Sequence, residues 1–222
     1  MHIEIADSLE ELTIGAADVL TGLLTAGPAT FGLAGGSTPR AVYRELQIRD
    51  IAWDQVTCWL PDERWVPPED PDANALMARR ELLDHVPARF LAPDTTLEDP
   101  NIAADAYELL LAAELDPSPD VVLLGMGDDG HAASLFPGTD ALDIDRPGYV
   151  ANWVPALNTW RLTATAGLLT STKHLIFLVA GASKAQVLKR ILIDGEPLPA
   201  GVVAEGASDV TWLLDREAAG EL

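Results

Sequence analysis

Short apolar runs alternate with helical patterns along this chain, and this alternation limits the possible folds more than any other feature. The clearest run is Val121-Val122-Leu123-Leu124, in which four apolar residues follow one another directly. Such a run is typical of a strand buried on both faces, as in a parallel sheet whose connections are helices. We therefore predict an α/β protein, with a Rossmann-like, mostly parallel sheet and helices on both faces.

The predicted elements can be placed by residue number. Strands are expected at 29–34, 56–60, 121–125, 161–166, 174–180 and 210–214. Helices are expected at 7–24, 37–47, 74–85, 101–115 and 183–193, with a short one after 215. Ser8 and Ser183 each stand three residues before a Glu or Gln, which is the spacing of a capping box. No linker rich in Gly, Ser or Pro divides the chain, so we expect residues 1–222 to form a single domain.

Acidic residues greatly outnumber basic ones. The chain has 35 Asp and Glu against 14 Lys and Arg, a formal net charge of −21. A field of this sign repels nucleic acid and anionic membranes, and it repels an anionic substrate unless the binding site holds local cations. The acidic surplus is typical of salt-adapted proteins, but an ordinary acidic cytoplasmic protein explains it equally well.

Location and redox chemistry leave few signals in the sequence. No apolar run reaches the roughly 20 residues of a membrane span, and the amino-terminal residues lack a signal-like pattern, so we expect a cytoplasmic protein. The one cysteine, Cys58, lies in an apolar run and is expected to be a small buried hydrophobe. No Cys/His spacing indicates a metal site, and the Gly-x-Ser-x-Gly elbow of serine hydrolases is absent.

The segment Gly125-Met126-Gly127-Asp128-Asp129-Gly130-His131 carries the strongest chemical signal. It directly follows the apolar run at 121–124, and its glycines allow a tight turn there. Ligands of open α/β sheets bind just outside the carboxyl ends of the strands. A histidine delivered to that edge can exchange protons near neutral pH.

Other polar clusters follow predicted strands at equivalent positions. Gly35-Gly36-Ser37-Thr38-Pro39 joins a strand to a helix, so its backbone N–H groups can bind an anion at the helix N-terminus. A plain strand-to-helix turn is an equally good interpretation of this motif alone. Asp62-Glu63-Arg64 follows the next strand, where a solvated charged turn is the simpler interpretation.

Three further residues are candidates for binding a ligand. Arg161 and Lys184 are cations in an acidic chain and can bind a phosphate, although a surface role would also explain each one. Asn74 follows a Pro-rich loop and is also suited to cap a helix.

Taken together, these segments resemble the glucosamine-6-phosphate isomerase/6-phosphogluconolactonase family, and within it the bacterial-type lactonases. The resemblance covers nearly the whole chain in family order. Its most specific piece runs from Leu124 to Gly138. Deaminases of the family have a ring-opening glutamate where this chain has Phe136, so the resemblance favours a lactonase.

The resemblance implies hydrolysis of 6-phospho-D-glucono-1,5-lactone to 6-phosphogluconate in the oxidative pentose phosphate pathway. His131 would be the general base, oriented by Asp129, while Arg64 would face the developing negative charge and Asp62 a sugar hydroxyl or the water. The remaining predicted binding residues would hold the substrate and its phosphate: Gly35, Gly36, Ser37, Thr38, Asn74, Arg161 and Lys184.

The resemblance implies no metal and no organic cofactor, and the expected partner is a small sugar-phosphate lactone. We expect no nucleic-acid or membrane partner, and either a monomer or a weak homodimer. Two alternatives remain open at this point. One is a glucosamine-6-phosphate deaminase/isomerase, and the other is a sensor domain that binds a sugar phosphate without turnover.

Overall fold

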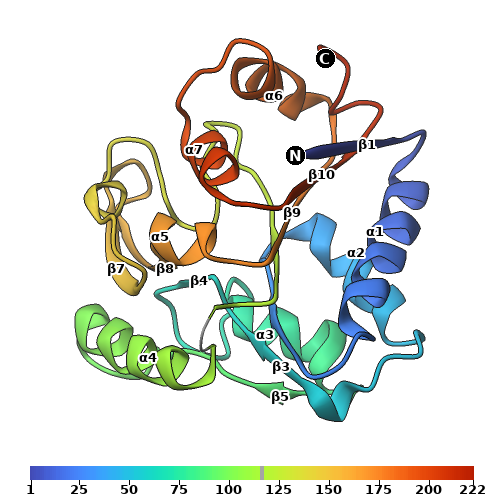
Figure 1. The fold of residues 1–222 in the computed structure, drawn as a ribbon. Coiled ribbons are helices and arrows are strands. Elements are labelled where there is room, and N and C mark those ends of the chain that lie inside the picture. The colour runs from blue at the N-terminus through green and yellow to red at the C-terminus, as the bar shows by residue number, and fades with distance from the viewer. Residues whose placement is uncertain (116–117) are drawn as a thin grey trace.

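Two sheets form the framework of the computed structural model, which describes residues 1–115 and 118–222. A seven-stranded parallel sheet has the order β1-β10-β9-β6-β2-β3-β5 (Figure 1). Its strands are β1 (His2–Ala6), β2 (Ala29–Gly32), β3 (Val56–Trp59), β5 (Arg89–Phe90), β6 (Val121–Leu124), β9 (His174–Val179) and β10 (Val210–Asp215). A three-stranded antiparallel sheet has the order β4-β8-β7, from β4 (Asp62–Arg64), β8 (Thr159–Ala164) and β7 (Tyr149–Val154).

Helices cover both faces of the parallel sheet, as the sequence predicts. One face packs against α1 (Leu9–Leu24), α2 (Ser37–Leu46) and α3 (Asn74–Ala78). The other packs against the antiparallel sheet and against α4 (Pro100–Glu114), α5 (Ala166–Thr170), α6 (Ala185–Leu192) and α7 (Pro199–Gly206). The predicted α/β fold class is therefore confirmed.

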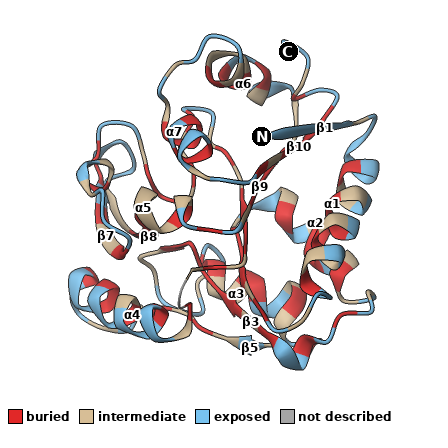
Figure 2. Ribbon diagram, viewed as in Figure 1, coloured by how far each residue is buried: buried red, intermediate tan, exposed pale blue. Residues whose placement is uncertain are grey.

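The central strand β6 shows why the parallel sheet needs cover on both sides. Successive side chains of a strand point to opposite faces. Val121 and Leu123 accordingly join the core beneath α1 and α2, while Val122 and Leu124 join the core on the opposite face. The strands in the middle of the sheet are buried along most of their length (Figure 2). Cys58 on β3 is fully buried, as predicted.

Several local predictions are confirmed and others are wrong. Ser8 caps α1, because its hydroxyl accepts the N–H of Glu11 at 3.1 Å. Ser183 does not cap a helix, since a 3₁₀ turn at Ala182–Lys184 precedes α6 and the Ser183 hydroxyl donates instead to Asp128. Turns replace the short helix expected after Asp215, whose carboxylate accepts the N–H of Ala218.

Other segments differ in extent or in type. The helix expected at 74–85 is divided into α3 and a π-helical stretch, Arg79–Leu83. Strand β1 was not expected, because at the sheet edge its side chains are largely exposed and show no buried pattern. Within the part of the chain described here, no helix is both long and apolar enough to cross a bilayer.

Candidate active site

A cavity of about 670 Å³ lies at the carboxyl ends of the parallel strands. The loops after β2, β6 and β9 form one side of it, and strands β4 and β8 of the antiparallel sheet contribute the other. All the predicted site residues except Asn74 line this cavity: Gly35, Gly36, Ser37, Thr38, Asp62, Arg64, Asp129, His131, Arg161 and Lys184. Gly35 and Lys184, which are far apart in sequence, thus meet at the sheet edge where the sequence predicts a ligand.

The turn after β6 fixes the imidazole of His131. Nδ1 lies 2.6 Å from Oδ1 of Asp129, and the same oxygen accepts the backbone N–H of His131 at 3.1 Å. An ionised carboxylate can only accept, so Nδ1 carries the hydrogen of this pair and Nε2 is left to accept a proton. A Cβ at Gly127 would overlap Nδ1 of His131, so this ring position requires glycine at 127.

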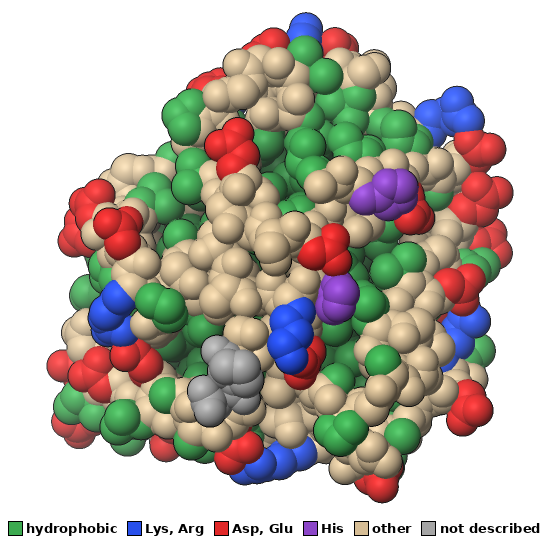
Figure 3. All heavy atoms as spheres, viewed as in Figure 1, with side chains coloured by type: hydrophobic (Ala, Val, Ile, Leu, Met, Phe, Trp, Pro, Cys, Tyr) green, Lys and Arg blue, Asp and Glu red, His purple; other side chains and the backbone are tan. Residues whose placement is uncertain are grey.

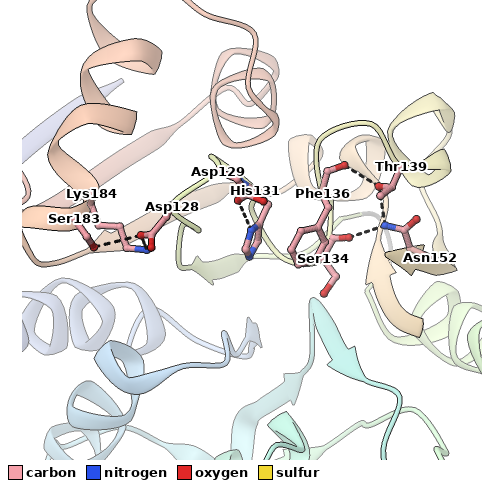
Figure 4. A network of polar contacts seen from close by, with 9 residues as sticks. All are labelled: Asp128, Asp129, His131, Ser134, Phe136, Thr139, Asn152, Ser183 and Lys184. Atoms are coloured by element: carbon pink, nitrogen blue, oxygen red, sulfur yellow. Dashed lines mark hydrogen bonds and ion pairs between the residues drawn. The ribbon is translucent and has the colours of Figure 1, made fainter. Parts of the chain in front are cut away.

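Lys184 enters the cavity from the 3₁₀ turn after β9. Its Nζ lies 2.6 Å from Oδ1 of Asp128, and the hydroxyl of Ser183 reaches the same oxygen at 3.3 Å (Figure 4). The hydrogen bond from Lys184 lowers the pKa of Asp128 below its ordinary value. Asp128 thus holds the Lys184 ammonium at the cavity wall, although the Asp128 side chain is itself largely exposed.

The N-terminus of α2 faces the cavity without a side-chain cap. Gly36 occupies the N-cap position, and neither Ser37 nor Thr38 caps the helix through its side chain. The first backbone N–H groups of a helix have no intrahelical acceptors, and the helix dipole favours an anion beside them. Because residues 35–38 line the cavity, these donors suit a phosphate group.

Asn74 lies behind the cavity wall and supports it. Its side-chain Nδ2 donates to the backbone oxygen of Asp62 at 2.8 Å and to Oδ1 of the same residue at 3.3 Å. Asn74 is only 1% exposed, and a Cβ at Gly35 would overlap its side chain. The N-cap position of α3 is Ala73, so the capping role considered for Asn74 is wrong. The structure therefore places Asn74 as a link between Asp62 and the loop after β2.

Arg64 and Arg161 lie directly opposite each other on paired strands β4 and β8. Like charges at such a position destabilise a sheet. Burial lowers the pKa of Arg161, and the neighbouring charge of Arg64 lowers it further. Among the described residues, neither guanidinium forms an ion pair, and each donates only to a backbone oxygen. Two such arginines in one cavity wall are a strong attraction for an anion.

Glu63 is buried beneath this wall, where the sequence suggested a solvated turn. Its carboxylate accepts the backbone N–H groups of Arg64, Asn74 and Ala75, each at 2.7 Å. Burial raises the pKa of Glu63 to about 7, while these three donors act in the opposite direction. Glu63 therefore joins β4 to the first turn of α3 and fixes the direction of the neighbouring Asp62 and Arg64.

Sequence reasoning missed several residues of the cavity wall. Phe136 and Ser134 belong to the same glycine-rich motif as His131, so their place after that turn was the available signal. Leu157 comes from a hairpin between β7 and β8, whose tip is a 3₁₀ turn at Pro155–Leu157. Beside that tip, the indole rings of Trp153 and Trp160 pack edge to face, with their centroids 5.5 Å apart. Leu157 was not among the predicted site residues.

Comparison with known proteins agrees with this geometry. Residues 4–212 match the family model described as glucosamine-6-phosphate isomerases/6-phosphogluconolactonase. The chain belongs to this family. A 6-phosphogluconolactonase from Nostoc sp. is 38% identical over 221 aligned positions. The match covers 92% of this chain and 90% of that protein. One from Mycobacterium tuberculosis is 35% identical, covering 99% and 98%.

Solved structures within the family share the fold. The 6-phosphogluconolactonase of Trypanosoma brucei matches 100% of this chain and 98% of its own, with a TM-score of 0.89 and 29% identity. A monomeric glucosamine-6-phosphate deaminase matches 100% of both chains, with a TM-score of 0.87 and 27% identity. Since both activities occur on this fold, the fold alone does not separate them.

The surface of the molecule carries the acidic surplus predicted from composition. Asp and Glu side chains are spread around the face seen in Figure 3, with Lys and Arg side chains between them. Against that background, Arg64, Arg161 and Lys184 all face one cavity. The site thus supplies the local cations that an anionic ligand of so acidic a protein requires.

Proposed function

We propose that this chain hydrolyses 6-phospho-D-glucono-1,5-lactone to 6-phosphogluconate in the oxidative pentose phosphate pathway. One observation carries the proposal: a carboxylate-oriented imidazole shares a cavity with three cations in a protein of net charge −21. The curated relatives at 38% and 35% identity carry the name of this enzyme. A phosphorylated lactone needs both features, because its phosphate needs cations and its ester needs a base.

The cavity provides a binding region for the far end of the substrate. The uncapped N–H groups of α2, together with Lys184 and Arg161, hold the phosphate in this proposal. Ser37 and Thr38 offer hydroxyl donors on the same turn. Binding at the phosphate orients the lactone carbonyl toward the imidazole, so that remote binding energy contributes to the rate.

The chemical step then follows from the groups at the other end. Nε2 of His131 takes a proton as water attacks the carbonyl carbon, and the positive charge that results faces Asp129. Arg64 stabilises the oxyanion of the tetrahedral intermediate. The intermediate collapses with cleavage of the bond to the ring oxygen, which accepts the proton from the imidazolium. Asp62 holds a sugar hydroxyl or positions the water.

The two alternatives make different demands on the same cavity. A deaminase needs a further acid/base group near the ring oxygen, yet the position that the resemblance assigns to it is Phe136, which lines the cavity. A sensor domain would bind the sugar phosphate without converting it. Cytoplasmic location, independence of metals and cofactors, the absence of a nucleic-acid partner, and a monomer or weak homodimer stay predictions.

Time-resolved lactone hydrolysis by the pure protein, corrected for the spontaneous reaction, tests the proposal. We expect His131→Ala to lower kcat by roughly 10²–10⁴-fold with its thermal unfolding unchanged. His174→Ala is the matched control, because His174 also bonds a carboxylate, that of Asp209 at 2.7 Å, but lies outside the cavity.

Three results would contradict the assignment. Wild-type turnover by His131→Ala would remove the base from the mechanism. Release of ammonia from glucosamine 6-phosphate, without lactone hydrolysis, would establish the deaminase instead. Saturable binding of 6-phosphogluconate without turnover of the lactone would identify a sensor domain.

A further inference from the structure

The ring of Phe136 packs against the imidazole of His131. Their centroids lie 4.0 Å apart, with an angle of 31° between the ring planes, and both side chains line the cavity (Figure 4). The hydrogen bond that His131 donates to Asp129 restrains the imidazole only at Nδ1. A ring held at one atom can still tilt about that contact, and the face of Phe136 blocks the tilt toward its own side.

The loop that carries Phe136 is anchored from outside the cavity. The Thr139 hydroxyl donates to the backbone oxygen of Phe136 at 2.7 Å. The Asn152 side chain donates through Nδ2 to that hydroxyl and to the backbone oxygen of Ser134, both at 2.9 Å. Asn152 is 1% exposed and Thr139 7% exposed, and neither lines the cavity. Asn152 stands on β7, so the antiparallel sheet fixes a loop that follows a parallel strand.

Hydrogen bonds also fix the other end of the loop, at Ser134. Ser134 donates its hydroxyl to Asp62 at 2.7 Å and its backbone N–H to the Thr163 hydroxyl at 3.2 Å. Ser134, Asp62 and Thr163 are all buried. Buried polar groups that are bonded to one another define a single arrangement, because any other one leaves donors or acceptors unpaired.

We propose that Phe136 is a positioning residue for His131, and that Thr139 and Asn152 hold it in place. The proposal rests on the base role of His131 and extends it to a reason for the ring's fixed orientation. Phe136 limits the imidazole to the orientation in which Nε2 faces the substrate. Thr139 and Asn152 act only through the backbone of its loop. General-base catalysis depends steeply on such alignment.

Two pairs of variants test the proposal. Phe136→Leu removes the aromatic face and keeps an apolar side chain, while Phe136→Tyr keeps the ring. Thr139→Val removes the hydroxyl that bonds the Phe136 backbone, while Thr139→Ser keeps it. The measurements are kcat and KM for the lactone, and the NMR shift of the His131 Cε1–H signal, which is assigned by its loss in His131→Ala. The chain has only four histidines, so this spectrum is simple.

We expect Phe136→Leu to lower kcat about tenfold and Thr139→Val a few-fold, with KM changed by less than about twofold, since the phosphate contacts are untouched. The Cε1–H signal should move downfield in both, because the ring current of Phe136 is lost or displaced. Phe136→Tyr and Thr139→Ser should retain kcat and the signal position. A wild-type kcat in Phe136→Leu, or an unmoved signal, would overturn the proposal. If the wild-type protein lacked lactonase activity, the proposed function would fail, while the NMR arm would still test the ring contact.

Discussion

The two walls of the cavity differ in whether their basic side chains are paired with a carboxylate. On the wall built by the loop after β6, the imidazole of His131 faces a carboxylate, that of Asp129, at 2.6 Å. On the wall built by the antiparallel sheet, Arg64 and Arg161 lie opposite each other without an ion pair among the described residues. The first arrangement holds the imidazole in one orientation. The second keeps positive charge available for a ligand.

This difference shows how an acidic protein can bind an anion. A guanidinium that was already paired with a carboxylate would have to lose that partner before it could bind a phosphate. Two unpaired arginines avoid this exchange, at a cost in sheet stability that a bound anion relieves. Lys184 is an intermediate case, because Asp128 holds it but is itself mostly exposed.

A change on the wall that carries His131 and Asp129 should have the largest effect on kcat. In Gly127→Ala, the new Cβ would overlap Nδ1 of His131, so the ring must leave its bond with Asp129. A displacement of about 1 Å in such a site costs on the order of 10² in rate, and we expect that loss in kcat. Gly15→Ala, on α1 and outside the cavity, is the control, since a Cβ there has no neighbour within 4 Å. Equal kcat values for the two variants would show that Gly127 does not position the ring.

On the wall built by the antiparallel sheet, replacing each arginine in turn should show which one contributes to substrate binding and which one to the chemical step. We expect Arg161→Ala to raise KM about tenfold, the equivalent of roughly 1.4 kcal/mol, with a small change in kcat. Arg64→Ala should instead lower kcat, because Arg64 faces the oxyanion in our proposal. Steady-state kinetics on both variants checks this division. A pure KM effect of Arg64→Ala would make Arg64 a binding residue.

The same substitution sharpens the comparison through stability. Inorganic phosphate should raise the Tm of the wild-type protein, and Arg161→Ala should reduce that rise while its Tm without phosphate stays level or increases. Arg89→Ala is a control outside the cavity, because Arg89 bonds Glu114 at the surface. An undiminished phosphate effect in Arg161→Ala would show that the anion binds elsewhere.

Glu63, beneath the arginine wall, predicts a smaller effect that depends on pH. Its pKa in the folded protein is raised from 4.5 to about 7, so the folded state keeps a proton that the unfolded chain releases between these values. The stabilisation is complete below pH 4.5 and is lost as pH rises toward 7. Urea unfolding from pH 5 to 7 should show the free energy of unfolding decreasing. Glu63→Gln should flatten this slope, while Glu69→Gln, at an exposed position, should not.

Salt should have the smallest effect. Raising KCl from about 0.1 M to about 1 M shortens the screening length from roughly 10 Å to 3 Å and weakens repulsion among surplus carboxylates. We expect Tm to rise by roughly 2–4 °C, which corresponds to about 1 kcal/mol for a chain of this size. No rise in Tm would count against a salt-adapted protein and favour an ordinary acidic one.

Much of the middle of the parallel sheet and its site could be predicted, because β6 and β9 are apolar along nearly their whole length and polar clusters closely follow β2, β3 and β6. The turn at 125–131 is local in sequence, so the contact between Asp129 and His131 could be predicted from their spacing. The antiparallel sheet was harder, since β4 has only three residues and its partner β8 lies about a hundred residues away. The opposition of Arg64 and Arg161 depends on that long-range register.

The errors have a common cause. Ser183 has the spacing of a capping residue, yet its hydroxyl bonds Asp128 on the loop after β6. Asn74 is suited to cap a helix, yet its amide bonds Asp62 from behind the wall. For each polar side chain, the local sequence offered a plausible hydrogen-bond partner, but in the fold it bonds a residue on another element. A single sequence contains no direct information about such distant partners.

The hairpin tip beside the cavity has a practical consequence. Trp153 and Trp160 are cross-strand neighbours whose ring planes meet at 62°, and Leu157, between them in sequence, lines the cavity. Two indoles at this distance and inclination couple their electronic transitions. The hairpin should therefore give a circular-dichroism signal of its own. A ligand that shifts Leu157 would alter the sign or size of the resulting circular-dichroism couplet, and the cavity's occupancy could be followed without a label.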